Sequence, residues 1–363
     1  MENLVTKLYN AYKGQTVIVT GHTGFKGSWL CQWLVKMGAN VVGISKDISS
    51  NPSMYTNNEI HKYLQQDIRL NVLEEQKLLE VFNTVKPNFI FHLAAQPIVS
   101  LSYKDPVDTF MNNTIGYATV LNAVRLMATP CSVVLASSDK CYKNKEWIWG
   151  YRENDELGGY DPYSASKATS EIVFESFYHS FFKNQNDKRI ASVRAGNVIG
   201  GGDWSVDRII PDAYRAWHSN EVLPLRRPNS IRPWQFVLEP LFGYLLTAIA
   251  LQNNEKLNGE CFNFGPDNTI NLPVVTMIEQ LSALSNNGKY VVDEAGATFY
   301  ETSLLKLNAD KAKSILEWIP VLQTNQTLQL IATWYTQYQS TQNLFELTNQ
   351  QIEFFEQAIT AVK

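Results

Sequence analysis

The feature that most constrains the fold is a run of three glycines at GxxGxxG spacing, Gly21, Gly24 and Gly27. It follows a β-branched run, residues 16–20, and precedes residues 28–37, whose apolar positions repeat at helical spacing. Glycines at such a junction let the backbone turn tightly against a pyrophosphate, which the N–H groups at the helix start attract. The pattern predicts a dinucleotide site, with a plain structural turn as the alternative. The residues predicted to contact the cofactor here are Gly21, Thr23, Gly24, Phe25, Lys26 and Gly27.

The first half of the chain repeats this alternation of strand and helix. Short apolar runs occur at residues 41–44, 89–95, 132–136 and 190–194. Short apolar strands separated by helices imply a parallel sheet covered on both faces. We therefore predict an α/β fold whose doubly wound parallel Rossmann sheet occupies residues 1–200.

The pattern changes after about residue 200, where loops rich in Gly, Arg and Pro precede mainly helical segments. We predict a smaller, mostly helical C-terminal substrate lobe over residues 201–363. Residues 261–264 resemble a strand, which we expect to return to the first domain. The amphipathic tail, residues 345–361, is expected to pack on its own subunit.

Composition limits the class of protein. The 363 residues hold 31 Lys and Arg against 35 Asp and Glu, so the net charge of −4 predicts no nucleic-acid surface. The four cysteines form no CxxC pair, which argues against a zinc site and a disulfide-stapled secreted protein. The most apolar run, residues 241–251, is too short to span a bilayer, and the start lacks an apolar signal region. We expect a cytoplasmic protein without metal or membrane.

The end of the second predicted strand bears on the choice of cofactor. Asp47 lies 20 residues past Gly27 (47 − 27), where a carboxylate would bind the ribose 2′-hydroxyl of NAD. Lys46 beside it could accept a 2′-phosphate, so NAD is favoured over NADP without being decided. The other positions assigned to the cofactor are Asp67 and Ile68, with a surface turn as their alternative, and Ala94 and Ala95.

Tyr163 and Lys167 are spaced i and i+4 after Pro162, a good helix start, so they share one helical face. A phenol with a pKa near 10 takes a proton from a sugar alcohol at neutral pH only if its anion is stabilised. Lys167 and a positive nicotinamide ring would lower that pKa. Ser138, after a predicted strand, would orient substrate and tyrosine. A solvated Tyr–Lys helix face is the alternative.

Asp139 and Lys140 follow Ser138 directly. A carboxylate at the carboxyl end of a strand, at the mouth of the cofactor crevice, is well placed for proton transfer. A plain oxidoreductase does not need this acid, whereas loss of a hydroxyl from carbon 6 of a hexose requires a proton donor. A helix cap or a surface salt bridge is the alternative for Asp139.

Six stretches carry a family resemblance: GHTGFKGSWL, HLAAQP, SSDKCY, WIWGYRENDELGGYDPYSASK, VRAGNVIGGGDW and SIRPWQFVLEPL. They resemble the CDP-glucose 4,6-dehydratases, nucleotide-sugar dehydratases of the extended short-chain dehydrogenase/reductase family, nearly word for word over roughly residues 14–340. In the dTDP-glucose and GDP-mannose dehydratases a glutamate base usually follows the aspartate. Here Lys140 stands in that position, as in the CDP-specific enzymes.

The resemblance implies a cycle in which NAD is regenerated. Tyr163 takes the proton of the sugar 4-hydroxyl while a hydride passes from C4 to NAD. Asp139 then protonates the 6-hydroxyl as the C5 proton is removed, and water leaves. The hydride returns to C6 and C5 is reprotonated, which gives CDP-4-keto-6-deoxy-D-glucose. Lys140 is a candidate C5 base if it is neutral, and stabilises the enolate if it is charged.

A nucleotide-sugar diphosphate needs local cations, and the planar fork of arginine matches phosphate oxygens. The resemblance assigns Arg208, Arg226 and Arg232 to substrate-binding loops, with surface charge as the alternative for each. Asn197 would bond the same diphosphate, and Gln96 would face the sugar or the nicotinamide. At residues 300–308 the family's histidine and tyrosine appear as Ser303 and Leu304, and its glutamate, a predicted substrate contact, is kept as Glu301.

Two other functions stay open. A nucleotide-sugar 4-epimerase needs Tyr163 and Lys167 but no acid at C6, so Asp139 separates it from a dehydratase. A redox-sensing NAD-binding protein without activity has no use for a poised tyrosinate. Oligomers built on a helical face are common among relatives, so we expect a homo-oligomer.

Overall fold

The computed structural model describes residues 3–267, 272–285, 288–293, 304–340 and 343–362. Its main element is a seven-stranded parallel sheet in the order β11-β6-β5-β4-β1-β2-β3. The strands are β1 (Thr16–Thr20), β2 (Asn40–Ser45), β3 (Gln66–Arg69), β4 (Phe89–His92), β5 (Cys131–Ala136), β6 (Lys188–Ala195) and β11 (Cys261–Phe264). The apolar residues of the central strands are buried on both faces, as a parallel sheet covered by helices requires.

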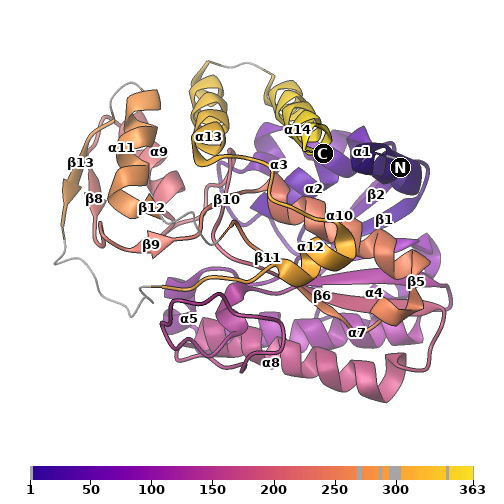
Figure 1. Cartoon of the computed structure of the whole chain (residues 1–363). Helices are drawn as coiled ribbons and strands as arrows, with labels where there is room; N and C mark the ends of the chain where they lie inside the picture. The colour runs from indigo at the N-terminus through magenta and orange to yellow at the C-terminus, as the bar shows by residue number, and fades with distance from the viewer. Residues whose placement is uncertain (1–2, 268–271, 286–287, 294–303, 341–342, 363) are drawn as a thin grey trace.

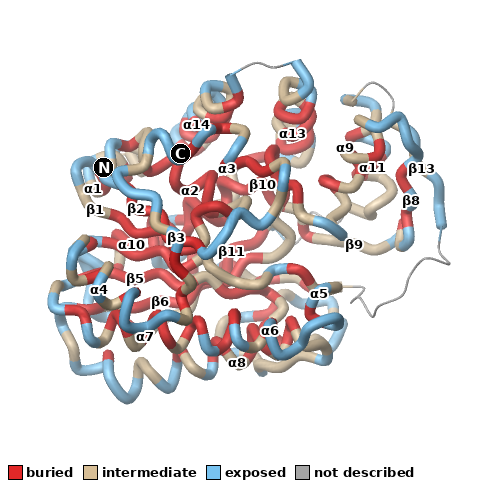
Figure 2. The backbone as a smooth tube through the Cα atoms, turned by 180° about the vertical axis from the view of Figure 1, so that it is seen from behind, coloured by how far each residue is buried: buried red, intermediate tan, exposed pale blue. Residues whose placement is uncertain are grey.

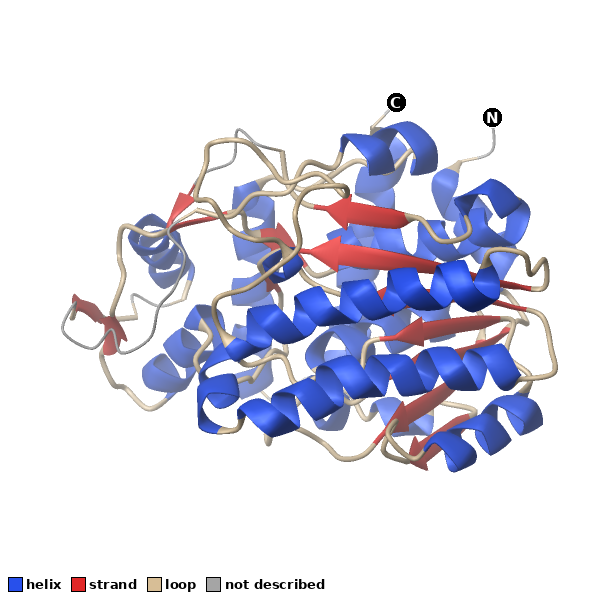
Figure 3. Cartoon of the chain, turned by 90° about the horizontal axis from the view of Figure 1, so that it is seen from below, coloured by secondary structure: helices blue, strands red, loops and turns tan. Residues whose placement is uncertain are grey.

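The sheet separates two helical layers, because successive side chains of a strand point to opposite faces. Val17 and Val19 of β1 belong to one buried core, and Ile18 between them belongs to the other. The first core contains α1 (Leu4–Tyr12), α2 (Phe25–Lys36) and α10 (Leu238–Asn253); the second contains α4 (Glu75–Val85), α7 (Gly116–Leu126) and α8 (Pro162–Phe177). Figure 3 shows long helices of the second layer across the sheet, and Figure 2 shows the buried strands inside.

The strand order confirms the predicted doubly wound Rossmann sheet. The chain runs outward through β1, β2 and β3, then returns to β4 on the other side of β1 and continues through β5 and β6. This reversal leaves a crevice at the carboxyl ends of the strands, where α/β folds bind ligands. Figure 3 shows the arrows of the sheet pointing one way, toward the part of the chain that carries the remaining elements.

Those remaining elements include a lobe of short strands and helices after residue 200. Within the described residues β8 pairs with β13, β9 with β12, and β7 with β10, so the expected helical lobe also contains small sheets. α10 and β11 leave the lobe and complete the layers of the main sheet. Besides α10 and β11, the strands and α-helices described after β6 are β7 (Val198–Ile199), α9 (Ile209–His218), β8 (Leu223–Leu225), β9 (Ile231–Arg232), β10 (Gln235–Phe236), β12 (Leu272–Pro273), α11 (Val274–Leu284), β13 (Tyr290–Val292), α12 (Asp310–Leu316), α13 (Thr324–Gln339) and α14 (Leu344–Ala361).

Short helices and turns connect the layers. They are α3 (Met54–Asn57), η1 (Ile60–Lys62), α5 (Val99–Lys104), α6 (Pro106–Phe110), η2 (Met111–Ile115), η3 (Asp139–Cys141), η4 (Tyr178–Phe182) and η5 (Glu255–Leu257). None of the described helices combines the length and apolar character that crossing a bilayer needs.

The two ends of the chain lie side by side. The tail helix α14 packs against α1 and α2, and Asn3 Nδ2 donates to Thr360 Oγ1 at 3.0 Å. Trp33 of α2 donates its indole N–H to Glu356 at 2.9 Å. Figure 1 places both termini on the side of the molecule away from β8 and β13.

Glu239, in the first turn of α10, is a carboxyl buried in the core. Its Oε1 accepts the backbone N–H groups of Val321 and Leu322 at 2.9 and 2.8 Å, and its Oε2 lacks a partner among the described residues. Burial raises the pKa of Glu239 to about 8, and these two N–H donors oppose the shift only in part. The folded chain therefore holds a proton on Glu239 at pH values where the unfolded chain has released it.

This shift predicts a pH-dependent stability. Because the pKa of Glu239 is higher in the folded state, the free energy of unfolding falls as pH rises from about 4.5 to about 8. Glu239→Gln does not titrate, so its melting temperature should rise relative to that of the parent over this window, by roughly 1–2 °C per kcal/mol regained. Glu353→Gln, at an exposed pair with Lys36, is the control. Parallel melting curves for the parent and Glu239→Gln at all pH values would contradict the prediction.

Candidate active site

The glycine turn after β1 is shaped for close approach of a phosphate group. Gly21 has φ +73°, and a Cβ there would lie 2.7 Å from the backbone N of Ala94. A Cβ on Gly27 would lie 2.1 Å from the carbonyl oxygen of Gly21, so the first turn of α2 can sit on the loop only without a side chain. Gly24 begins α2 without a side-chain cap, which leaves backbone N–H groups for a ligand. The turn has the shape that a dinucleotide pyrophosphate requires.

The predicted neighbours of this turn lie along the ends of β2, β3 and β4. Thr23 donates its hydroxyl to the carbonyl oxygen of Asp47 at 2.7 Å, and Asp47 itself is exposed just past β2. Ile68 pairs with Ile44 in the register of β3 and β2. Ala94, just past β4, donates its N–H to the hydroxyl of Thr20, at the end of β1, at 3.3 Å.

The carboxylate of Asp67 is held by three side chains that the sequence analysis did not single out. His22 Nε2 lies 2.8 Å from Asp67 Oδ1, Arg69 donates to Oδ2 at 2.9 Å, and the Tyr55 hydroxyl also bonds Oδ2. Burial lowers the pKa of His22, although Asp67 opposes that shift. The position of His22 inside the GxxGxxG turn is the sequence signal that could have found it.

Tyr163 and Lys167 share a face of α8, as their spacing predicts. Pro162 opens this helix, and Asp161 caps it by accepting the N–H of Ser164 at 2.9 Å. Both side chains are buried, with 7% of Tyr163 and 5% of Lys167 exposed. Burial lowers the pKa of Lys167 to about 8, and the charge of Glu171 one turn further opposes the shift.

The pKa of Tyr163 depends on its burial and on residues at the start of η3. Burial raises the pKa of its phenol, and the charge of Lys140 and a hydrogen bond with Ser138 oppose that rise most. Lys167 and the nicotinamide ring were expected to lower this pKa, and in the structure Lys140 leads the groups that lower it. The turn after β5 therefore acts on the tyrosine together with the helix that carries it.

That turn, η3, brings three predicted residues into contact. Ser138 Oγ donates to Asp139 Oδ1 at 2.9 Å, and Lys140 Nζ lies 3.3 Å from the same oxygen. Asp139 is only 1% exposed, and its Oδ2 lacks a hydrogen-bond partner among the described residues. A Cβ on Gly196 would lie 3.2 Å from this oxygen, so the glycine keeps the space beside it open. One oxygen of this buried acid thus has no hydrogen-bond partner among the described residues, directly behind Ser138 and Lys140, which line the cleft.

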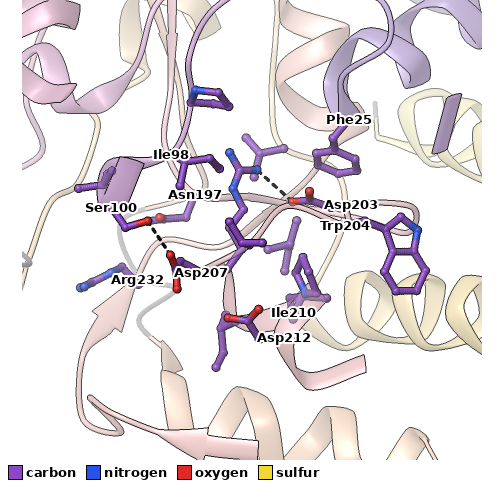
Figure 4. Close-up of a pocket in the computed structure, with 18 of the residues that line it drawn as sticks. Phe25, Ile98, Ser100, Asn197, Asp203, Trp204, Asp207, Ile210, Asp212 and Arg232 are labelled. Carbon is purple, nitrogen blue, oxygen red and sulfur yellow. Dashed lines mark hydrogen bonds and ion pairs between the residues drawn. The ribbon is translucent and has the colours of Figure 1, made fainter. Parts of the chain in front are cut away.

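A cleft of about 1150 Å³ joins these groups to the lobe. Ser138, Lys140, Tyr163 and Lys167 line it from the sheet side. The predicted substrate residues Asn197, Arg208, Arg226 and Arg232 line it from the loops that follow β6 and from the lobe. Figure 4 shows Asn197 and Arg232 among the side chains around this space.

Acidic side chains hold two arginines of the cleft in place, and these acidic partners were not predicted from the sequence. Arg208 donates to Asp203 Oδ2 at 3.0 Å, and Arg226 Nη1 lies 3.9 Å from Asp207 Oδ1. Asp207 also accepts the hydroxyl of Ser100 from α5, so one carboxylate connects the sheet domain to the lobe (Figure 4). Lys26, at the start of α2, also lines the cleft. Burial, followed by the charges of Lys167 and Arg208, lowers the pKa of Lys26 to about 7.

Two predicted substrate contacts are not seen facing this cleft. The amide of Gln96 donates to the Thr109 hydroxyl at 2.9 Å and accepts the N–H of Ile98, which ties it into its own loop. Glu301 lies outside the described residues.

His92 is buried, with Nδ1 2.8 Å from the Thr20 hydroxyl, and burial lowers its pKa to about 3. It is a core histidine with a hydrogen-bond partner.

The model of the family described as GDP-mannose 4,6 dehydratase matches residues 18–331 of this chain. The chain belongs to that family. Within the GDP-mannose 4,6-dehydratase family, it is 39% identical over 356 residues to the CDP-glucose 4,6-dehydratase of Salmonella typhimurium, covering 97% of this chain and 99% of that protein.

Solved structures share the fold of this family member. An epimerase, Mth375, of Methanothermobacter thermautotrophicus matches with a TM-score of 0.78 and 23% identity, covering 96% of this chain and 98% of its own. The dTDP-glucose 4,6-dehydratase of Bacillus anthracis in complex with NAD matches with a TM-score of 0.72 and 19% identity, covering 92% of this chain and all of its own. At these identities the likeness establishes the fold alone.

Proposed function

We propose that this protein is a CDP-glucose 4,6-dehydratase, an NAD-dependent lyase that converts CDP-D-glucose to CDP-4-keto-6-deoxy-D-glucose and water. One observation carries the proposal: a buried acid, Asp139, with one unpartnered oxygen, stands beside Ser138 and next to the Tyr163 phenol. An epimerase that acts only at C4 has no use for this acid. The 39% identity to a CDP-glucose 4,6-dehydratase over nearly the whole of both chains supports the same substrate.

The oxidation half of the reaction would use Tyr163. NAD, held with its pyrophosphate at the glycine turn, would accept the hydride from C4 and later return it. The Tyr163 phenolate takes the proton of the sugar 4-hydroxyl, and the Lys140 ammonium and the Ser138 hydroxyl favour that anion against the effect of burial. The positive charge of the bound cofactor adds to them. Lys167 is a buried side chain one helical turn away on the same face of α8.

The elimination half would use Asp139 and Lys140. Asp139 gives a proton to the 6-hydroxyl as it leaves, and Lys140 takes the C5 proton, which it can do only as an amine. Transfer of one proton from Lys140 to Asp139 across their 3.3 Å contact prepares both groups at once. The hydride then returns to C6, and Lys140 gives the proton that it took back to C5. Each turnover therefore leaves an extra proton on Tyr163 and one too few on the Lys140–Asp139 pair, and Ser138, which bonds Tyr163 and Asp139, is the route that restores it.

The nucleotide side of the substrate would lie against the lobe. Arg208, Arg226 and Arg232 supply the charge that a diphosphate needs, and Asn197 adds an amide donor at the same wall of the cleft. Asp203 and Asp207 hold the first two arginines in place before a substrate arrives.

A panel of nucleotide hexoses tests the proposed function. With added NAD, CDP-glucose should give a 4-keto-6-deoxy product without net NADH, and the dTDP-, GDP- and UDP-hexoses should react more slowly; mass spectrometry of the sugar nucleotide measures the loss of water. Stoichiometric NADH would contradict the cycle. Conversion of CDP-glucose to its 4-epimer without water loss would favour the epimerase.

We also propose that the enzyme is a cytoplasmic homo-oligomer. Val107, Met111, Ile115, Ile172 and Phe181 are large exposed apolar residues on or beside the outer helices α6, α7 and α8, a face suited to a second copy. All four cysteines are free, which suits a reducing compartment. Sedimentation at assay concentrations measures the oligomeric state.

A further inference from the structure

Beneath the cleft, a buried polar network joins the two segments that carry the reacting groups. Arg194 of β6 forms a forked pair with Glu171 of α8, with Nε to Oε1 at 3.0 Å and Nη2 to Oε2 at 2.8 Å. The Ser192 hydroxyl donates to the same Oε1 at 2.8 Å. The side chains of Arg194 and Glu171 are 3% and 1% exposed. Glu171 follows Lys167 at the same i+4 spacing that separates Lys167 from Tyr163, so the Arg194–Glu171 pair anchors the helix α8 that carries both of them.

The remaining arm of Arg194 reaches the turn of the acid. Its Nη1 donates to the Tyr142 hydroxyl at 2.7 Å and to the carbonyl oxygen of Glu153 at 2.9 Å. Tyr142 ends η3, where its backbone N–H donates to the carbonyl oxygen of Asp139 at 3.3 Å. The Tyr142 hydroxyl in turn donates to Asn263 of β11 at 2.8 Å. One guanidinium thus bonds both α8 and the segment that carries Asp139.

Stability alone does not account for this arrangement. Burying an ion pair costs desolvation, and apolar residues of similar volume often stabilise a core as well or better. What the charged network supplies is geometry, because a planar fork fixes two partners at set distances and directions. Arg194, Glu171 and Tyr142 do not line the cleft, so they can act only through the residues they hold.

We infer that Arg194 and Tyr142 are positioning residues that set the spacing between the oxidation dyad on α8 and the acid Asp139 on η3. This inference rests on the proposed function, since it assumes that Tyr163 acts at C4 and Asp139 at C6 of one sugar. Without the hydrogen bond between Arg194 and Tyr142, Asp139 and Tyr163 keep their local contacts, but the distance between the acid and the tyrosine is no longer fixed. A misplacement of an ångström can cost on the order of 10²-fold in rate.

Tyr142→Phe tests the link, because the ring keeps its stack on Tyr151 at 5.1 Å and Arg194 keeps Glu171 and Glu153 as partners. In single turnovers with CDP-glucose, oxidation at C4, seen as NADH absorbance, should keep its rate. Water loss should slow roughly tenfold, so NADH that the parent never accumulates should appear. Arg194→Lys keeps the charge but loses the forked pair with Glu171, so it should also slow water loss relative to oxidation at C4. It replaces Tyr142→Phe as the test if that variant folds poorly.

Tyr151→Phe is the matched control. It removes a buried tyrosine hydroxyl from the same stacked pair, but that hydroxyl bonds the N–H of Lys145 and the side chain of Asn144 instead of Arg194. Its ratio of oxidation to water loss should equal that of the parent, at a similar melting temperature. An unchanged ratio in Tyr142→Phe, or an equal fall of both rates in the two variants, overturns the inference. A parent that forms no 4-keto-6-deoxy sugar instead removes the proposed function, and this inference with it.

Discussion

Tyr163→Phe should lower the turnover of CDP-glucose by about 10²–10⁴-fold, the usual contribution of a positioned general base. The phenylalanine ring fills the same buried site at the start of α8, so the dissociation constant of CDP-glucose should change little. The loss should fall on the first step, and no NADH should form even in a single turnover. Stopped-flow absorbance with the NAD-loaded enzyme measures that step, and calorimetric titration measures binding.

Tyr244→Phe is the control for this variant. Tyr244 is another fully buried tyrosine whose charge interactions include Tyr163 and Asp139, and its hydroxyl has no partner among the described residues. Loss of that hydroxyl should leave turnover within about twofold, because it removes no hydrogen bond on the described part of the chain. Near-normal turnover in Tyr163→Phe, or an equal loss in both variants, would take the role of base away from Tyr163.

Asp139→Asn should separate the two halves of the reaction. The amide keeps the size of the side chain and can still accept the Ser138 hydroxyl, but it cannot give a proton to a leaving hydroxyl. Oxidation at C4 should persist while water loss falls by about 10²–10⁴-fold. The expected signature is bound NADH together with a 4-keto hexose that retains its 6-hydroxyl, measured by absorbance and by mass spectrometry after rapid quenching.

Asp212→Asn is the comparison. Asp212 lines the cleft and pairs with Arg215 on α9, in the lobe. This variant should change the Michaelis constant more than the ratio of oxidation to water loss. Unchanged water loss in Asp139→Asn would mean that another group protonates the leaving hydroxyl, and the distinction between dehydratase and epimerase drawn from Asp139 would fall with it.

The main sheet could be predicted because its signals are local. A β-branched run that ends at Gly21 and an i, i+4 pair after Pro162 each specify their own element, and repetition of strand and helix then leaves few topologies. The lobe is different. β8, β9, β12 and β13 are two or three residues long, too short for any periodicity, and pairing with distant partners defines them.

The same limit applies to the site. Ser138, Asp139 and Tyr163 could be proposed from the sequence because each stands in a short pattern with a chemical reason. The contact of Ser100 with Asp207 joins residues 107 positions apart, and the hydrogen bond of Gln96 to Thr109 depends on how the loop after β4 meets α6. No spacing along the chain encodes such contacts. The influence of Lys140 on the phenol likewise arises only once β5 and α8 are folded together.

The adjacency of the chain ends has a practical consequence. Asn3 and Thr360 are hydrogen-bonded, so a short peptide could join the termini, and a circularly permuted gene could open the chain at an exposed loop instead. Both ends lie away from the lobe in Figure 1. An enzyme tethered to a solid support through either end would therefore leave the mouth of its cleft turned toward the solution.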